Sequence, residues 1–210
     1  LILDHNKLTI LPKEIEGLFR LKTLSVVDNR LKEVPAEISK MTSLERLAVN
    51  YNKLKELPPD IAELPKLTRL WISNNYISVI PAQYYKLTLL TQLYAGDNPW
   101  ETPPKKTVEK GIIPILRDCK ERWERYRRGG RPPEVKTVSV GILSEVVVPE
   151  PRYQDKLEFA HKSASRTNQL RLQWLQLKEI PPQFYELTSL TDLGVMCNLL
   201  TAIPITLCKR

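Results

Sequence analysis

A 23-residue period of leucines constrains the fold of this chain more than any other feature. The repeating unit reads LxxLxLxxNxLxxLPxxIxxLxx, and it begins at four evenly spaced positions: Leu21, Leu44, Leu67 and Leu90. Within a unit, apolar residues such as Leu47 and Val49 alternate with polar or variable ones, which is the period of a short strand with one buried face. A short unit repeated at a fixed period predicts a solenoid in which these strands stack into a parallel sheet.

Asparagine and proline recur at fixed places in the unit. Asparagine follows each strand, at Asn6, Asn29, Asn52, Asn75 and Asn98. At such a turn, an inward amide can donate to and accept from backbone groups that would otherwise be unpaired. Proline recurs in the return segment, at Pro12, Pro35, Pro58 and Pro81. These prolines hold the return segments extended, and they would interrupt each helix if the leucines belonged to amphipathic helices instead.

The unit is that of a leucine-rich repeat. We therefore predict an α/β leucine-rich repeat solenoid with a parallel sheet on the concave face, an irregular or short helical convex side, and helical caps. Residues 170–210 contain two further units. The first of them has Leu175 in place of the asparagine, as expected of a terminal, capping repeat.

Four regions follow from this pattern. They are repeats at 1–104, a capping helix and basic linker at 105–136, a flanking strand and helix at 137–169, and further repeats at 170–210. Apolar residues spaced by three and four predict the capping helix from about Pro114 to Arg128. Val135 to Val148 is apolar and β-branched, which predicts a strand or an extended docking segment. Tyr153 to Ala164 is predicted to be a short helix, in which His161 packs rather than catalyses.

The two ends of the sequence fit each other. The chain begins at Leu1 in the middle of a repeat, and it stops at Arg210 with a repeat unfinished. Leu1 would continue the period after Leu193 if about five residues lay between Arg210 and Leu1. We therefore expect residues from about Lys136 onward to precede Leu1 in the natural chain. The alternative is two separate arrays joined by a linker.

The repeats and the residues Asn98, Pro99 and Trp100 at the start of the cap resemble the intracellular leucine-rich repeat proteins of the Ras suppressor and scribble types. The resemblance covers Leu1 to Arg128 and Leu170 to Arg210. It implies a curved scaffold that binds proteins through its concave sheet, in the cytoplasm or on the cytoskeleton. It does not identify the partner, because leucine-rich repeats share a fold more widely than a function.

Composition excludes several other classes. The three cysteines are odd in number and lack both paired flanking clusters and CxxC spacing, which favours a reducing, cytoplasmic compartment. No apolar run approaches the ~20 residues of a membrane helix, and no secretory signal is visible. There is no glycine-rich phosphate loop, and the two histidines, His5 and His161, lie near no catalytic motif. We predict neither enzymatic activity nor a cofactor or metal.

Our first functional hypothesis is a protein interaction scaffold whose partner binds the concave face. Outward positions of the strands carry the residues expected to bind it: Arg46, Tyr51, Arg69, Trp71 and Tyr94. Trp71 and Tyr94 occupy the same position of consecutive repeats, so their strands should be ~4.8 Å apart and their rings should touch. Tryptophan, tyrosine and arginine dominate interface energetics. Alternatively, the two rings shield the sheet or pack against Val135 to Val148.

The second hypothesis is a cytoskeletal or axonemal component that docks through its basic flank on an acidic, microtubule-like filament. Eleven Lys or Arg against six Asp or Glu between Glu101 and Lys136 give that flank a charge of +5. The expected patch consists of Arg122, Arg125, Arg127, Arg128 and Arg131. A solvated helix face is the alternative explanation. A nucleic-acid partner is disfavoured, because the flank lacks interleaved aromatic platforms.

Overall fold

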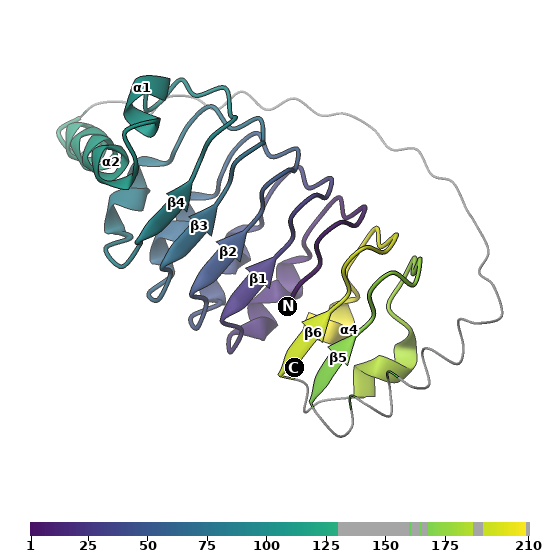
Figure 1. Cartoon of the computed structure of the whole chain (residues 1–210). Helices are drawn as coiled ribbons and strands as arrows, with labels where there is room; N and C mark the ends of the chain where they lie inside the picture. The colour runs from purple at the N-terminus through teal and green to yellow at the C-terminus, as the bar shows by residue number, and fades with distance from the viewer. Residues whose placement is uncertain (130–159, 161–163, 165–167, 187–190, 209–210) are drawn as a thin grey trace.

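The computed structural model describes residues 1–129, 160, 164, 168–186 and 191–208, and its strands all pair in parallel (Figure 1). One sheet has the order β1-β2-β3-β4, and a second pairs β5 with β6. The strands are β1 Thr23–Ser25, β2 Arg46–Ala48, β3 Arg69–Trp71, β4 Gln92–Tyr94, β5 Gln169–Arg171 and β6 Asp192–Gly194. Equivalent residues of successive repeats are register partners, as in Leu47 with Leu70. The 23-residue period therefore sets the register, and the predicted parallel sheet on the concave side of a solenoid is confirmed.

Residues near Leu1 join the two sheets. Ile2 forms parallel bridges to Gly194 of β6 and to Ser25 of β1. Its amide donates to the Leu193 carbonyl at 2.9 Å, and the Leu3 amide donates to the Ser25 carbonyl at 2.8 Å. The strand that contains Leu193 thus lies beside Leu1. The covalent order and the region boundaries inferred from the spacing stay predictions.

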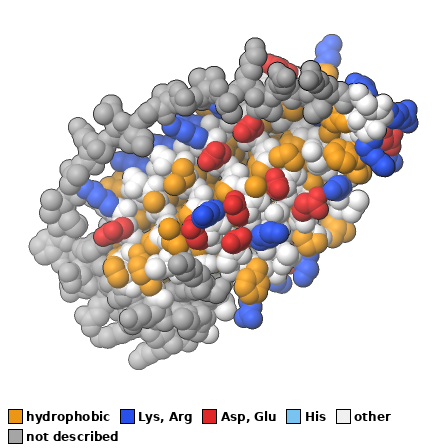
Figure 2. Space-filling model, turned by 180° about the vertical axis from the view of Figure 1, so that it is seen from behind, with side chains coloured by type: hydrophobic (Ala, Val, Ile, Leu, Met, Phe, Trp, Pro, Cys, Tyr) orange, Lys and Arg blue, Asp and Glu red, His pale blue; other side chains and the backbone are white. Residues whose placement is uncertain are grey.

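The return segments form short 3-10 helices behind the sheet. They are η1 Lys13–Leu18, η2 Ala36–Lys40, η3 Pro59–Glu63, η4 Ala82–Lys86 and η5 Pro182–Glu186. The predicted prolines immediately precede η1 to η4, and those before η1 to η3 are extended, for example Pro35 with φ −67° and ψ 147°. The short helical convex side is therefore confirmed. Figure 2, which views the molecule from behind Figure 1, shows acidic and basic side chains interspersed with apolar ones.

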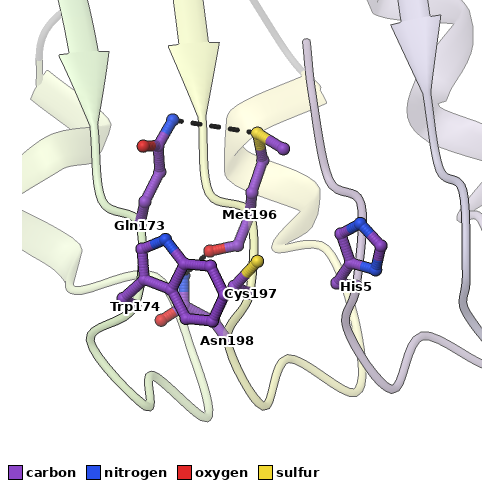
Figure 3. A pocket seen from close by; sticks show the side chains of 6 residues that line it. All are labelled: His5, Gln173, Trp174, Met196, Cys197 and Asn198. Atoms are coloured by element: carbon purple, nitrogen blue, oxygen red, sulfur yellow. Dashed lines mark hydrogen bonds between the residues drawn. The ribbon is translucent and has the colours of Figure 1, made fainter.

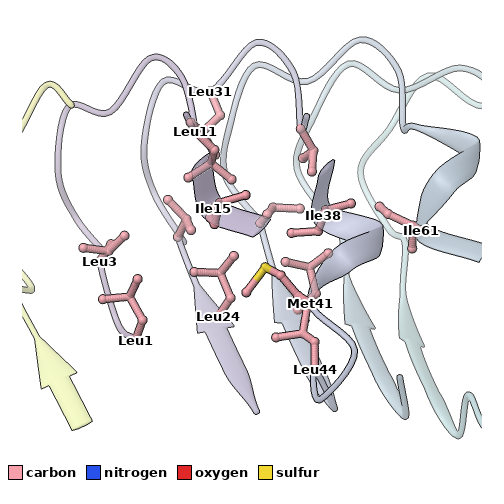
Figure 4. Packing of buried hydrophobic residues seen from close by; sticks show 14 of the residues in the cluster. Leu1, Leu3, Leu11, Ile15, Leu24, Leu31, Ile38, Met41, Leu44 and Ile61 are labelled. Atoms are coloured by element: carbon pink, nitrogen blue, oxygen red, sulfur yellow. The ribbon is translucent and has the colours of Figure 1, made fainter. Parts of the chain in front are cut away.

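The core fills the space between the strands and the 3-10 helices (Figure 4). Inward residues of the strands, such as Leu24, meet Ile38 and Met41 from the return segments, and all three are fully buried. Burying a leucine or isoleucine side chain contributes about 1.5–3 kcal/mol. Because each repeat contacts its neighbours, this core is continuous along the array.

The repeated asparagines satisfy the backbone of the turns. Asn52 accepts a hydrogen bond from the Leu31 amide at 2.9 Å and donates to the carbonyls of Val26 and Val49 at 2.8 and 3.0 Å. Where Leu175 replaces the asparagine, the neighbouring Asn198 accepts from the Leu175 amide at 3.0 Å. The predicted role of the inward amide is confirmed.

Helices α1 Lys105–Val108 and α2 Ile112–Arg127 close the first array, and α4 Ile205–Cys208 follows the last described repeat. Helix α2 begins two residues before the predicted Pro114, because the first turn needs no intrahelical amide donor and tolerates proline there. Gly111 precedes it with φ 93°, a conformation that favours glycine. The side of α2 that faces η4 includes Trp123, whose ring centroid lies 5.9 Å from that of Tyr85.

Part of the remaining sequence lies outside the described residues. This holds for the predicted segment from Val135 to Val148 and for His161. Of the predicted helix from Tyr153 to Ala164, the described residues Ala160 and Ala164 are helical, and Ala164 is buried.

Candidate functional site

Trp71 and Tyr94 form an aromatic pair on the sheet face, by which we mean the surface of outward side chains on the strands. They are register partners in β3 and β4, and the preceding residues Leu70 and Leu93 point into the core. Their ring centroids are 5.6 Å apart, with an interplanar angle of 69°. The predicted ring contact is confirmed, and the edge-to-face geometry is a favourable one. Tyr94 is 55% exposed and Trp71 is half-buried.

Arg46 and Arg69 lie beside this pair on the same face. They are register partners of β2 and β3, and Arg69 is in the same strand as Trp71. The Arg46 Nε donates to Thr23 Oγ1 at 2.9 Å. Among the described residues, neither guanidinium has a carboxylate within ion-pair distance. The structure therefore brings four of the five predicted binding residues together on neighbouring strands.

Tyr51 lies at the edge of this surface, where the chain leaves β2. It is 56% exposed, and its φ of 53° is left-handed. Every repeat with a described turn has a residue with φ between 51° and 59° at this position, and three of these seven residues are Asp or Asn, which tolerate the conformation best. A bulky residue there costs about 1–3 kcal/mol. Tyr51 makes no ring contact with Trp71 or Tyr94 in the part of the chain that the structure describes.

Two buried polar atoms on this face have no hydrogen-bond partner within the described residues. They are the Trp71 Nε1 and the Asn50 Oδ1. A buried, unpaired donor or acceptor costs about 1–3 kcal/mol. The sequence gives no signal for these two atoms, because their burial depends on how the Trp71 ring lies across the neighbouring strand positions.

The decisive comparison is with a family model. The model described as leucine rich repeat matches residues 42–99, which include β2, β3 and β4. This part of the chain is a leucine-rich repeat array. The four neighbouring site residues Arg46, Arg69, Trp71 and Tyr94 all lie inside the matched range. No curated protein matches the chain.

Several solved structures are similar to about half of the chain. A plant peptide hormone receptor, RGFR1 in complex with RGF2, is 33% identical with a TM-score of 0.44, over 47% of this chain and 16% of that one. The BIR3–SERK2 complex from Arabidopsis thaliana is 29% identical with a TM-score of 0.44, over 47% and 55%. The protein LIC12759 of Leptospira interrogans is 27% identical with a TM-score of 0.38, over 47% and 31%. The chain thus spans between 16% and 55% of the length of these chains.

One residue of the basic patch predicted on the cap is not exposed in the structure. Arg122 is only 7% exposed, and its Nε donates to Asp118 at 2.6 Å. The prediction that Arg122 belongs to an exposed patch is wrong, because the residue lies on the same helix face as Cys119, which packs against the repeat array. Arg125, Arg127 and Arg128 are exposed near the end of α2, and Arg131 lies outside the described residues.

A pocket of about 540 Å³ lies where β5, β6 and the residues near Leu1 end (Figure 3). It is lined by His5, Gln173, Trp174, Met196, Cys197 and Asn198. The repeat spacing places Trp174, Cys197 and His5 at equivalent positions of consecutive repeats, so this column could have been found from the sequence. The pocket itself could not have been predicted from the sequence, because its volume depends on the orientations of the side chains in that column.

The chemistry at this pocket does not favour nucleophilic catalysis. Burial and the carboxylates of Asp4 and Asp28 raise the pKa of the Cys197 thiol, so the thiolate is disfavoured. The His5 Nδ1 is 2.9 Å from an Asp28 carboxylate oxygen, and no hydrogen bond joins Cys197 to His5 within the described residues. Elsewhere in the described ranges, no group of three His, Cys, Asp or Glu side chains could hold a metal ion. None of the described helices is long and apolar enough to cross a membrane.

Proposed function

We propose that this protein is an interaction scaffold that binds a protein partner through its sheet face, centred on Trp71 and Tyr94. The observation that carries the proposal is an outward aromatic pair, more than half exposed at Tyr94 and with two arginines beside it. Outward aromatics on a strand fill no core. Tryptophan, tyrosine and arginine are the residues whose loss most often costs an interface 2 kcal/mol or more.

The strands beneath this surface are fixed by parallel pairing and by buried leucines, which favours binding. Trp71 and Tyr94 follow Leu70 and Leu93, and Leu70 is fully buried beneath the sheet. Parallel pairing fixes the spacing of their strands. Binding to a preorganised surface requires little further loss of conformational entropy. We therefore expect the complex to lose little free energy in ordering these side chains.

The test is a double substitution, Trp71→Ala with Tyr94→Ala. Both side chains project away from the core, so we expect thermal unfolding to be nearly unchanged. Capture of the proteins that wild-type chain retains from a cell extract should weaken at least about tenfold, which corresponds to ~1.4 kcal/mol. Quantitative mass spectrometry of the captured proteins measures the loss.

The matched control is Tyr76→Ala. Tyr76 is 60% exposed, comparable with Tyr94, but it follows the turn asparagine Asn75 rather than lying on a strand. The control should retain the same proteins as wild type. Normal capture by the double variant, or an equal loss in the Tyr76 control, contradicts the proposal.

A second candidate is docking on an acidic cytoplasmic filament through the cap. It is supported by Arg125, Arg127 and Arg128, which are exposed near the end of α2 and form no ion pair with a described residue. Replacing these three by Gln should weaken co-sedimentation with microtubules and flatten its dependence on salt. Unchanged co-sedimentation would remove this candidate and leave the sheet-face proposal intact.

A further inference from the structure

The charged side chains of the sheet face differ in the partners they have within the protein. Asp4 accepts from the Ser25 hydroxyl at 2.6 Å and from the Val27 amide at 2.8 Å. Asp28 pairs with His5 at 2.9 Å. These acidic side chains are therefore occupied within the protein.

One arginine of this face also has a charged partner within the protein, but two others have none among the described residues. Arg171 pairs with Asp192, and this contact lowers the pKa of the Asp192 carboxyl. Arg46 and Arg69 have no such partner among the described residues, although their strands are adjacent. Like charges directly opposite each other on a sheet repel. The pair is thus a place where an added anion lowers the electrostatic free energy.

We propose that the sheet face recognises an acidic segment of a protein partner, with one carboxylate on Arg46 and Arg69 and one apolar side chain against Trp71 and Tyr94. This rests on the function proposed above and adds the chemistry of the partner. A guanidinium is suited to carboxylates, because its planar donors can hold both oxygens. The aromatic rings offer the adjoining apolar contact.

The spacing of the two parts predicts a sequence pattern. Arg69 and Trp71 are both outward and two residues apart in β3, which is about 6.6 Å at 3.3 Å per residue. An extended peptide places its side chains i and i+2 on one face at the same distance. We therefore expect the partner segment to contain Asp or Glu two residues from a large apolar residue.

The distribution of charge favours a protein segment over a nucleic acid. A phosphate backbone carries a charge at every nucleotide and needs a continuous basic track. The described sheet face instead carries Asp4, Asp28 and Asp192, with Asp97 exposed where the chain leaves β4. One acidic side chain beside an apolar one fits this surface, whereas an extended polyanion would meet these carboxylates.

The experiment is selection from a phage-displayed library of random 12-residue peptides against the intact 210-residue protein. Enriched peptides are synthesised with a fluorescent label, and their affinities are measured by anisotropy. The test variant is Arg46→Gln with Arg69→Gln. A matched control, Arg125→Gln with Arg127→Gln, removes the same charge from α2. A third variant, Arg46→Lys with Arg69→Lys, keeps the charge but removes the planar fork.

We expect enriched peptides to carry the acidic and apolar residues two positions apart. The Gln pair should weaken their binding at least about tenfold, the Lys pair less, and the α2 control less than about twofold. Wild-type affinity should fall as salt rises, since the contact involves charges near the surface. Circular dichroism should show that all variants remain folded, because both arginines lie on the surface side of the strands.

Other outcomes separate this inference from the proposed function. Some peptides could lose affinity for the Trp71→Ala, Tyr94→Ala variant but bind the Gln pair normally. That result would overturn the proposed preference for an acidic segment and would leave the proposed binding surface in place. Peptides that bind all these variants normally, or a library that yields no enriched peptide, would overturn both. Tighter binding of a 20-nucleotide single-stranded RNA, lost in the Gln pair, would overturn the choice of a protein ligand.

Discussion

Replacing Asn52 by Ala should destabilise the fold strongly, although the side chain is small and does not pack like a core leucine. Asn52 is buried, and it bridges two repeats by accepting from the Leu31 amide and donating to the Val26 carbonyl. The Val49 carbonyl also accepts a hydrogen bond from the side-chain amide of Asn75, so it keeps a partner when the Asn52 side chain is removed. The substitution therefore leaves two buried backbone groups without hydrogen bonds.

The expected magnitude follows from those two groups. Each unpaired buried backbone group costs about 1–3 kcal/mol, so Asn52→Ala should lose about 2–6 kcal/mol of unfolding free energy. Urea unfolding followed by circular dichroism measures this quantity. The control is Asn50→Ala in the same repeat, because the Asn50 Oδ1 has no hydrogen-bond partner among the described residues. It should not lower the unfolding free energy, because it removes a buried acceptor that makes no hydrogen bond.

Two results would contradict this role of Asn52. One is a loss below about 1 kcal/mol for Asn52→Ala, which would mean that water or a shifted backbone satisfies the two groups. The other is an equal loss for Asn50→Ala, which would mean that any polar truncation in this turn has the same effect.

Three further predictions concern the core, the cap and the cysteines. Leu70→Ala should cost about 2–5 kcal/mol in urea unfolding, because Leu70 is fully buried, whereas Ser73→Ala, three residues later at a partly exposed position, should cost little. Arg122→Ala should cost about 2–4 kcal/mol because it leaves Asp118 unpaired, while Arg125→Ala should be nearly neutral; similar small effects in both would contradict the burial of Arg122. Burial raises the pKa of Cys119 to about 12 and that of Cys208 to about 11, so in native protein at pH 7.5 iodoacetamide should alkylate Cys197, whose pKa is also raised but which is only half-buried, faster than either of them. Labelling of Cys119 at the same rate would show that the cap opens readily.

Much of this fold could be predicted from the sequence because its determinants are periodic. The spacing of 23 residues makes Leu24, Leu47, Leu70 and Leu93 register partners, and the turn asparagines follow at a fixed distance. The contact between Trp71 and Tyr94 follows from the same register. The 3-10 helices have only five or six residues each, which is too short for a periodic apolar signal.

The burial of Arg122 could have been predicted from the sequence, but for a different reason. It follows Ile115 by seven residues and Cys119 by three, so helical spacing places it on the buried face of α2. That signal was present in the sequence, but a cluster of arginines suggested an exposed patch instead. Asp118, four residues before Arg122, completes the ion pair that makes its burial possible. The burial of the Trp71 Nε1 had no such signal, since it depends on side-chain orientation.

Hydroxyl-radical footprinting of the protein with and without a bound partner shows whether the sheet face is the binding surface. It reports the solvent exposure of each aromatic side chain in the same sample. We predict that oxidation of Trp71 and Tyr94 falls on binding, while Tyr76 and Trp174, which are 60% and 76% exposed, are oxidised at unchanged rates. Protection of Trp174 or of the cap residue Trp123, with Tyr94 oxidised as in the free protein, would contradict the assignment of the sheet face as the binding surface.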